Sequence, residues 1–205
     1  MGIAAGVTGP SRAQETSRST LVVRRAREEV AGKVAYDRRY VARGTGAPAS
    51  DRGACTDLVI RAFGAAGIDL QTKLQLDAQR APSAYASITN RDGRIDHRRA
   101  TNLHVYFSRN ARKLPTDLGK NRDLTLRSLA AGDVVVWTYG TCPECKADHV
   151  GIVSDKLGTR GLPLVIHNAG PRATEEDALD AWPLLGHFRV VDCCLLYTSP
   201  SPRDR

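Results

Sequence analysis

The sequence predicts an α+β fold, with helices in the first half of the chain and a mostly antiparallel sheet in the second half. The first half contains segments whose apolar residues recur at helical spacing, and the second contains short runs of β-branched and aromatic residues separated by turns. The 205 residues are 41% hydrophobic and 25% charged, which is ordinary for a globular protein of one domain.

Ser19–Tyr40 is predicted to form the first helix, because apolar residues recur at roughly helical spacing and charged residues fill the gaps. The glycine-containing stretch 41–52 is predicted to be a loop. Further along we expect a helix interrupted near Pro82 and another over Thr101–Ala111, which Asp96 would cap.

Residues 53–67, GACTDLVIRAFGAAG, are the stretch around which the chain is organised. Cys55 nearly begins a helix here, and the residues three, four and seven positions further on are all apolar, so Cys55 shares the buried face. Gly67 fits the position that ends such a helix. The unpaired N–H groups at a helix start favour a thiolate, so we expect a lowered pKa for Cys55.

Four strands are predicted in the second half, because these segments are β-branched, aromatic and bounded by turns. They are VVVWTY (134–139), HVGIVSD (149–155), LPLVIHNAG (162–170) and GHFRVV (186–191). An acidic stretch around Glu175–Ala181 is predicted to be helical. By strand alternation His149 shares a face with Gly151, and His167 shares a face with Val165. If the two strands are neighbours, both imidazoles project towards the start of the Cys55 helix.

A cysteine nucleophile, a histidine base and a group that orients the base form a recognised catalytic pattern. We assign these roles to Cys55, His149 and His167. The alternative for each residue is structural: a small cysteine in a helix contact and hydrogen-bonded histidines in a sheet. The joint occurrence of all three favours catalysis over the structural reading by roughly three to one.

Several stretches resemble a bacterial family, domain of unknown function 1287, which is grouped with the papain-like, NlpC-type cell-wall peptidases. They are YDRRYV, GACTDLVIRAFGAAGIDLQ, IDHRRATNL, AGDVVVW, HVGIVSD, VIHNAG and GHFRV, within residues 30–190. The resemblance implies a papain-like fold, with the cysteine helix packed on a small barrel-like sheet. It places the group's Cys-His-polar triad on Cys55, His149 and His167, and by analogy implies cleavage of a peptide amide in peptidoglycan.

Two features depart from the better-known NlpC-type pattern. Ala54 stands where those enzymes have an acidic residue, and Asp57 follows the cysteine instead; we interpret it as a cap of the helix start. Cys142 and Cys145 form a Cys-x-x-Cys pair before His149. One such pair is a weak zinc signal, so a disulfide or two loop thiols is preferred by roughly two to one.

Three residues are candidates for substrate binding. Tyr40 lies upstream of the cysteine, where related enzymes use a tyrosine, although core packing is an equal alternative. His97, next to two arginines, either meets substrate carboxylates or belongs to a helix start. Asn168 follows His167, and its alternative is a hydrogen bond to the turn backbone. No cofactor or metal is expected.

The formal charge of +8 comes mainly from scattered arginines and suits an anionic partner such as cell-wall polymer. No nucleic-acid motif accompanies it, and no apolar stretch reaches the eighteen or so residues that span a membrane. We expect a monomer located in the periplasm or secreted. Residues 1–18 are predicted to be disordered or the remnant of an export signal, 19–193 to be the domain, and 194–205 to be a non-native, adaptor-like tail.

The leading hypothesis is therefore a cysteine peptidase or amidase. One alternative is a cell-wall-binding protein that keeps the fold without activity, and another is a zinc protein that uses Cys142, Cys145 and His149.

Overall fold

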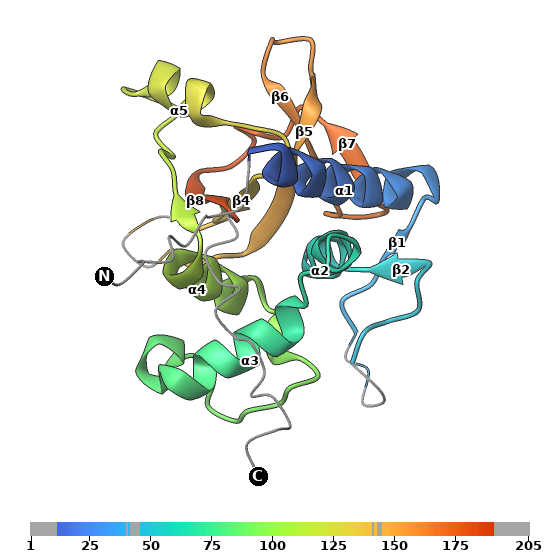
Figure 1. Ribbon diagram of the computed structural model, residues 1–205, viewed down its shortest axis with the longest axis vertical. Coiled ribbons are helices and arrows are strands. Elements are labelled where there is room, and N and C mark those ends of the chain that lie inside the picture. The colour runs from blue at the N-terminus through green and yellow to red at the C-terminus, as the bar shows by residue number, and fades with distance from the viewer. Residues whose placement is uncertain (1–11, 40, 42–45, 141, 143–144, 191–205) are drawn as a thin grey trace, which may run out of the picture.

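The computed structural model describes residues 12–39, 41, 46–140, 142 and 145–190. Its helices are α1 (Arg12–Ala31), α2 (Cys55–Ala65), α3 (Leu70–Arg80), α4 (Ala100–Asn110) and α5 (Arg122–Ser128), with short 3-10 helices η1 (Pro82–Tyr85) and η2 (Asp96–Arg98). Its strands are β1 (Ala35–Tyr36), β2 (Arg52–Gly53), β3 (Arg112–Lys113), β4 (Val134–Trp137), β5 (His149–Leu157), β6 (Pro163–His167), β7 (Thr174–Glu176) and β8 (Leu184–Arg189). The predicted α+β class is confirmed (Figure 1).

Six strands form the main sheet in the order β3-β8-β4-β5-β6-β7, and each neighbouring pair is antiparallel. β3 and β7 are its edges, so within the described part of the chain the sheet is open, and the barrel-like closure expected from the resemblance is corrected. β1 and β2 form a separate parallel pair that leads directly into α2.

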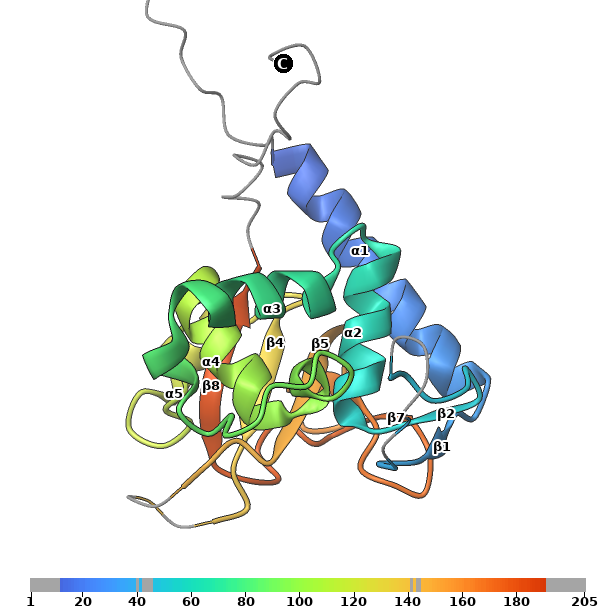
Figure 2. The same ribbon diagram turned by 90° about the horizontal axis from the view of Figure 1, so that it is seen from below.

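The centre of the sheet is covered on both faces. α1, α2 and α4 lie on one face, where α2 contacts β5 (Figures 1 and 2). Val134 and Val136 belong to the core under these helices, whereas Val135 and Trp137 belong to a smaller core on the other face. All four side chains are buried, which explains why β4 is a continuous apolar run.

The first helix differs from the prediction at both ends. It begins at Arg12, inside the stretch predicted to be disordered or the remnant of an export signal, and it ends at Ala31 instead of Tyr40. Gly32 and Lys33 follow it, and Lys33 has a φ of 51°, in the left-handed region that a continuing helix does not allow. The chain beyond becomes β1, so the apolar spacing overstated the length of the helix.

The acidic stretch 175–181 was also predicted wrongly. It begins in β7 at the edge of the sheet and not in a helix. Asp96 does not cap α4, because it lies in η2 and its Oδ2 accepts a hydrogen bond from the N–H of Asp92 at 3.0 Å. Arg99 is the residue that precedes α4.

None of the described helices is long and apolar enough to cross a lipid bilayer. The predicted tail 194–205, with Cys193 beside it, lies outside the described residues, as do residues 1–11.

Gly151 of β5 offers a test of how tightly the smaller core is packed. A Cβ at this position would lie 2.7 Å from Cγ1 of Val165 and 3.1 Å from two ring carbons of Trp137. We expect Gly151→Ala to lower the free energy of unfolding in urea by about 1–3 kcal/mol.

Gly64→Ala is the matched control, because Gly64 lies in α2 and a Cβ there meets nothing within 4 Å. It should raise the free energy of unfolding by about 0.5–1 kcal/mol. Equal free energies of unfolding for Gly151→Ala and the wild type would show that the side chains around β5 shift to accommodate the added methyl group.

Candidate active site

Cys55 is the first residue of α2, and Ala54, which precedes it, has no side chain that can cap a helix. Asp57 supplies the missing interaction from inside the helix, since its Oδ2 accepts a hydrogen bond from the N–H of Ala54 at 2.8 Å. The expected capping role of Asp57 is therefore confirmed. Because Asp57 is buried, its charge needs a partner.

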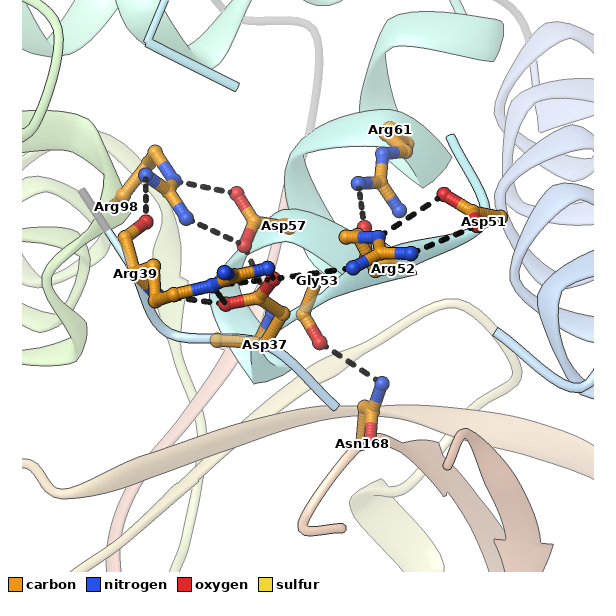
Figure 3. A network of polar contacts seen from close by, with 10 residues as sticks. Asp37, Arg39, Asp51, Arg52, Gly53, Asp57, Arg61, Arg98 and Asn168 are labelled. Atoms are coloured by element: carbon orange, nitrogen blue, oxygen red, sulfur yellow. Dashed lines mark hydrogen bonds and ion pairs between the residues drawn. The ribbon is translucent and has the colours of Figure 1, made fainter. Parts of the chain in front are cut away.

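Arg98 provides that partner (Figure 3). Its Nε and Nη2 donate to the two carboxylate oxygens of Asp57 at 2.7 and 3.0 Å, and both side chains are only 3% exposed. Nη1 of Arg98 also donates to the carbonyl of Gly46 at 2.8 Å, and Oγ1 of Thr56 donates to the carbonyl of Arg98 at 2.9 Å. The start of the cysteine helix is thus fastened to η2, a segment some forty residues away along the chain.

Asn168 fastens the same helix start from the sheet side (Figure 3). Its Nδ2 donates to the carbonyl of Gly53 at 2.9 Å and to that of Val34 at 3.3 Å. Its Oδ1 accepts from the N–H of Gly170 at 3.3 Å. The side chain is buried and occupied by backbone partners, which favours the hydrogen-bonding alternative over a role in substrate binding.

His97 is buried as well, within η2. Burial lowers the pKa of its imidazole, and the neighbouring charge of Arg98 lowers it further. A neutral, buried ring cannot meet a substrate carboxylate at the surface, so the structural alternative is favoured. Tyr40, the third candidate, lies outside the described residues.

His149 and His167 meet as the sequence predicts. β5 and β6 are antiparallel neighbours, and Nε2 of His149 lies 2.7 Å from Nδ1 of His167. The two rings meet edge to face with centroids 5.0 Å apart, and both residues are buried. The other ring nitrogen of His167, Nε2, lies 3.0 Å from Oε1 of Glu176 on β7.

Aromatic rings enclose the ring of His149, a feature that sequence reasoning missed. Trp137, its partner across β4 and β5, stacks on it with centroids 5.4 Å apart, and Tyr139 stacks at 6.0 Å. Trp182 meets it edge-on at 5.7 Å. The signal was present in the run VVVWTY, where residues 137 and 139 share one face of a strand.

The sulfur of Cys55 lies beside the beginning of β5. The backbone N–H of Val150, the residue after His149, is directed at it. Tyr139, which stacks on His149, is also near the sulfur: burial, and after it the charge of a Cys55 thiolate, raises the pKa of Tyr139 to about 12. Tyr139 therefore lies near both the sulfur of Cys55 and the ring of His149, and both Tyr139 and Tyr36, which is also near the thiol, are partly exposed.

The electrostatics of the thiol differ from the prediction. Burial raises the pKa of Cys55 to about 11, although the N–H groups of Val150 and Thr56 act in the opposite direction. Burial also lowers the pKa of His149 to about 3, with a further contribution from His167. Both groups are thus neutral at pH 7, and the expected lowering by the helix start is outweighed by burial.

Cys142 and Cys145 are joined in a disulfide, one of the two arrangements that the sequence favoured over a zinc site. Their sulfurs are therefore not available as thiolate ligands, and Nε2 of His149 is engaged by His167. Among the described residues no group of three or more metal-binding side chains gathers.

Comparison with known proteins gives matches to a family model, to a relative and to a solved structure. The model of the family "Domain of unknown function (DUF1287)" matches residues 23–190. The uncharacterized protein YijF of Escherichia coli K12 is 37% identical over 170 residues, which cover 80% of this chain and 78% of that protein. A crystal structure from Staphylococcus aureus, described as similar to lipoprotein, NLP/P60 family, is 14% identical with a TM-score of 0.40, covering 92% of this chain and 45% of that one. This chain therefore corresponds to less than half of the staphylococcal protein.

The Asp57–Arg98 ion pair should dominate the stability of the helix start. Arg98→Ala leaves a buried carboxylate without its cation, so we expect the free energy of unfolding to fall by about 3–5 kcal/mol. Arg39→Ala is the control, because the Arg39 side chain is 75% exposed and pairs with Asp37 near the surface. Arg39→Ala should lower the free energy of unfolding much less in the same urea titration. Similar decreases for the two variants would show that burial does not make the Asp57–Arg98 pair more important than a surface pair.

The neutral thiol predicts a distinct pH dependence of alkylation. The rate with iodoacetamide should rise about tenfold per pH unit across pH 7–10, because the reactive thiolate becomes more abundant up to the pKa of Cys55. Cys55→Ser supplies the background from Cys193 and Cys194, and glutathione supplies an ordinary thiol for comparison. A plateau that begins below pH 7 would instead reveal a preformed thiolate.

Proposed function

The chain belongs to the DUF1287 family, and we propose that it is a cysteine hydrolase that cleaves peptide amide bonds in peptidoglycan. The observation that carries the proposal is the hydrogen-bonded pair of His149 and His167, together with the backbone N–H of Val150, the residue after His149, which is directed at the sulfur of Cys55. The choice of peptidoglycan rests on the sequence resemblance to NlpC-type cell-wall peptidases and remains an analogy.

In the proposed reaction, the sulfur of Cys55 attacks the carbonyl carbon of the scissile amide while His149 accepts the thiol proton. The carbonyl oxygen becomes an oxyanion, for which the backbone N–H groups in the first turn of α2 are suitable donors. His149 then gives its proton to the leaving amine, and a thioester joins the acyl group to Cys55. Water, deprotonated by His149, hydrolyses this thioester and restores the thiol.

Neutral resting groups suit general-base catalysis. Neither the thiol nor the imidazole carries a charge before substrate binds, so neither pays a standing desolvation cost. His167 would hold the ring of His149 in place while the proton moves. Tyr36 and Tyr139, which are 40% and 52% exposed, border the sulfur and are proposed to contact the substrate.

The disulfide between Cys142 and Cys145 supports a location outside the cytoplasm, because such bonds persist in oxidising compartments. We therefore propose a periplasmic or secreted protein whose partner is cell-wall peptide. The excess of arginine and lysine is compatible with an anionic polymer.

A second candidate function is an inactive cell-wall-binding protein of the same fold. The raised pKa of Cys55 is consistent with this second function, because a buried neutral thiol can be unreactive. Slow alkylation at neutral pH does not separate the two functions, since both predict it. Hydrolysis separates them.

We expect purified protein to release new amines from peptidoglycan fragments, detected by mass spectrometry. Cys55→Ser and His149→Ala should reduce turnover by at least about 10³-fold, because nucleophile and base act as a unit. His167→Ala should lose less, about 10- to 100-fold, because the nucleophile and the base remain. His104→Ala is the control, since His104 lies on α4 against Phe188.

All four variants should keep the wild-type circular dichroism spectrum. Undiminished hydrolysis by Cys55→Ser would exclude the cysteine mechanism. Binding of peptidoglycan without any hydrolysis by the wild type would favour the inactive wall-binding protein.

A further inference from the structure

Glu176 is the residue that completes the row of hydrogen bonds behind His149. It lies on β7, the edge strand next to β6, and its Oε1 is 3.0 Å from Nε2 of His167. Oγ1 of Thr174 donates to the same carboxylate oxygen at 2.9 Å. Strand alternation explains why Glu175, the preceding residue, points elsewhere: it bonds to Arg27 and Ser154.

The chemistry of this row determines where the protons are. An ionised carboxylate only accepts hydrogen bonds, so Nε2 of His167 must carry the proton that faces Glu176. Burial lowers the pKa of His167, so the ring is neutral at pH 7 and carries one proton. Its Nδ1 is then an acceptor, and the 2.7 Å contact requires His149 to donate from Nε2. Because His149 is neutral too, its Nδ1 carries no proton.

We propose that Glu176 is a positioning residue that fixes the tautomers of both histidines, and thereby makes Nδ1 of His149 the nitrogen that receives the proton of Cys55. The assignment of the tautomers stands on the hydrogen bonds and on the neutrality of the two buried rings. The proton transfer from Cys55 rests on the proposed hydrolase function.

The position of Glu176 fits this role. Its side chain is 55% exposed, whereas that of His167 is 1% exposed, so the carboxylate remains in contact with water while it holds a buried ring. Exposure screens its charge, so the effect on His149 is carried by the directed hydrogen bond more than by long-range attraction. If His167 took the other tautomer, its Nδ1–H would face Nε2 of His149, and the proton of His149 would move to Nδ1 and block the base.

The tautomers can be read directly from histidine labelled with ¹⁵N, in long-range ¹H–¹⁵N correlation spectra of the full chain at pH 7. Single His→Gln variants assign the five rings. In the wild type we expect both His149 and His167 to be protonated at Nε2. Glu176→Gln should keep this pattern, because the amide oxygen still accepts and the hydroxyl of Thr174 favours that orientation.

Glu176→Ala removes the acceptor, and we expect a mixture of tautomers at both rings together with a fall in kcat of about tenfold at unchanged KM. Glu28→Ala is the matched control, since the Glu28 side chain is 58% exposed and lies on α1, in an ion pair with Arg24. It should change neither the spectra nor kcat.

A proton on Nδ1 of His149 in the wild type would overturn the proposal, as would unchanged spectra in Glu176→Ala. Loss of kcat in Glu176→Ala with unchanged tautomers would also overturn it, because that result indicates a structural role. If the wild type hydrolyses nothing, the hydrolase function and the proton transfer from Cys55 fail, and the spectra still decide whether Glu176 sets the tautomers.

Discussion

The position of Cys55 depends on one buried ion pair. Asp57 and Arg98 are almost fully excluded from water, and each has further backbone partners: the N–H of Ala54 for the carboxylate and the carbonyl of Gly46 for the guanidinium. Burying two charges is costly unless geometry and hydrogen bonds compensate, and here both do. In this bidentate ion pair the guanidinium and the carboxylate can rotate little relative to each other, so the pair fixes the helix start relative to η2. The remaining freedom of the preceding backbone is removed by Asn168, which holds the carbonyl of Gly53.

Burial also sets the chemistry that the site can perform. It raises the pKa of the thiol to about 11 and lowers that of His149 to about 3, so proton transfer between them is unfavourable before substrate arrives. In the proposed reaction, the transfer becomes favourable only as the sulfur bonds to a carbonyl carbon and the negative charge moves to an oxygen near the helix start. Such a site, in the proposed reaction, stays uncharged at rest and separates charge only while the bond is cleaved.

Strand alternation and helical spacing were sufficient to predict the α+β class, the cysteine helix and the shared face of His149 and His167. The class and the cysteine helix depend on residues close together in sequence, and the shared face of the two histidines follows from alternation within each strand once β5 and β6 are neighbours. The failures have other causes. The first helix ends at Ala31, because Lys33 just beyond it adopts a left-handed backbone conformation that apolar spacing does not encode. The partnership of Asp57 with Arg98 joins residues 41 positions apart, and charge alone, in a chain with 30 lysines and arginines, does not identify the pair.

The stretch 175–181 shows how one wrong element conceals a site residue. Read as a helix, Glu175 and Glu176 would lie on adjacent sides of a solvated surface. As an edge strand, they point to opposite faces of the sheet, one to the α1 side and the other to His167. The edge matters further, because a strand within the sheet would bury this carboxylate and raise the cost of its charge. At the edge, the carboxylate of Glu176 contacts water on one side and the buried ring of His167 on the other. This arrangement follows from the position of β7 at the edge of the sheet, next to β6.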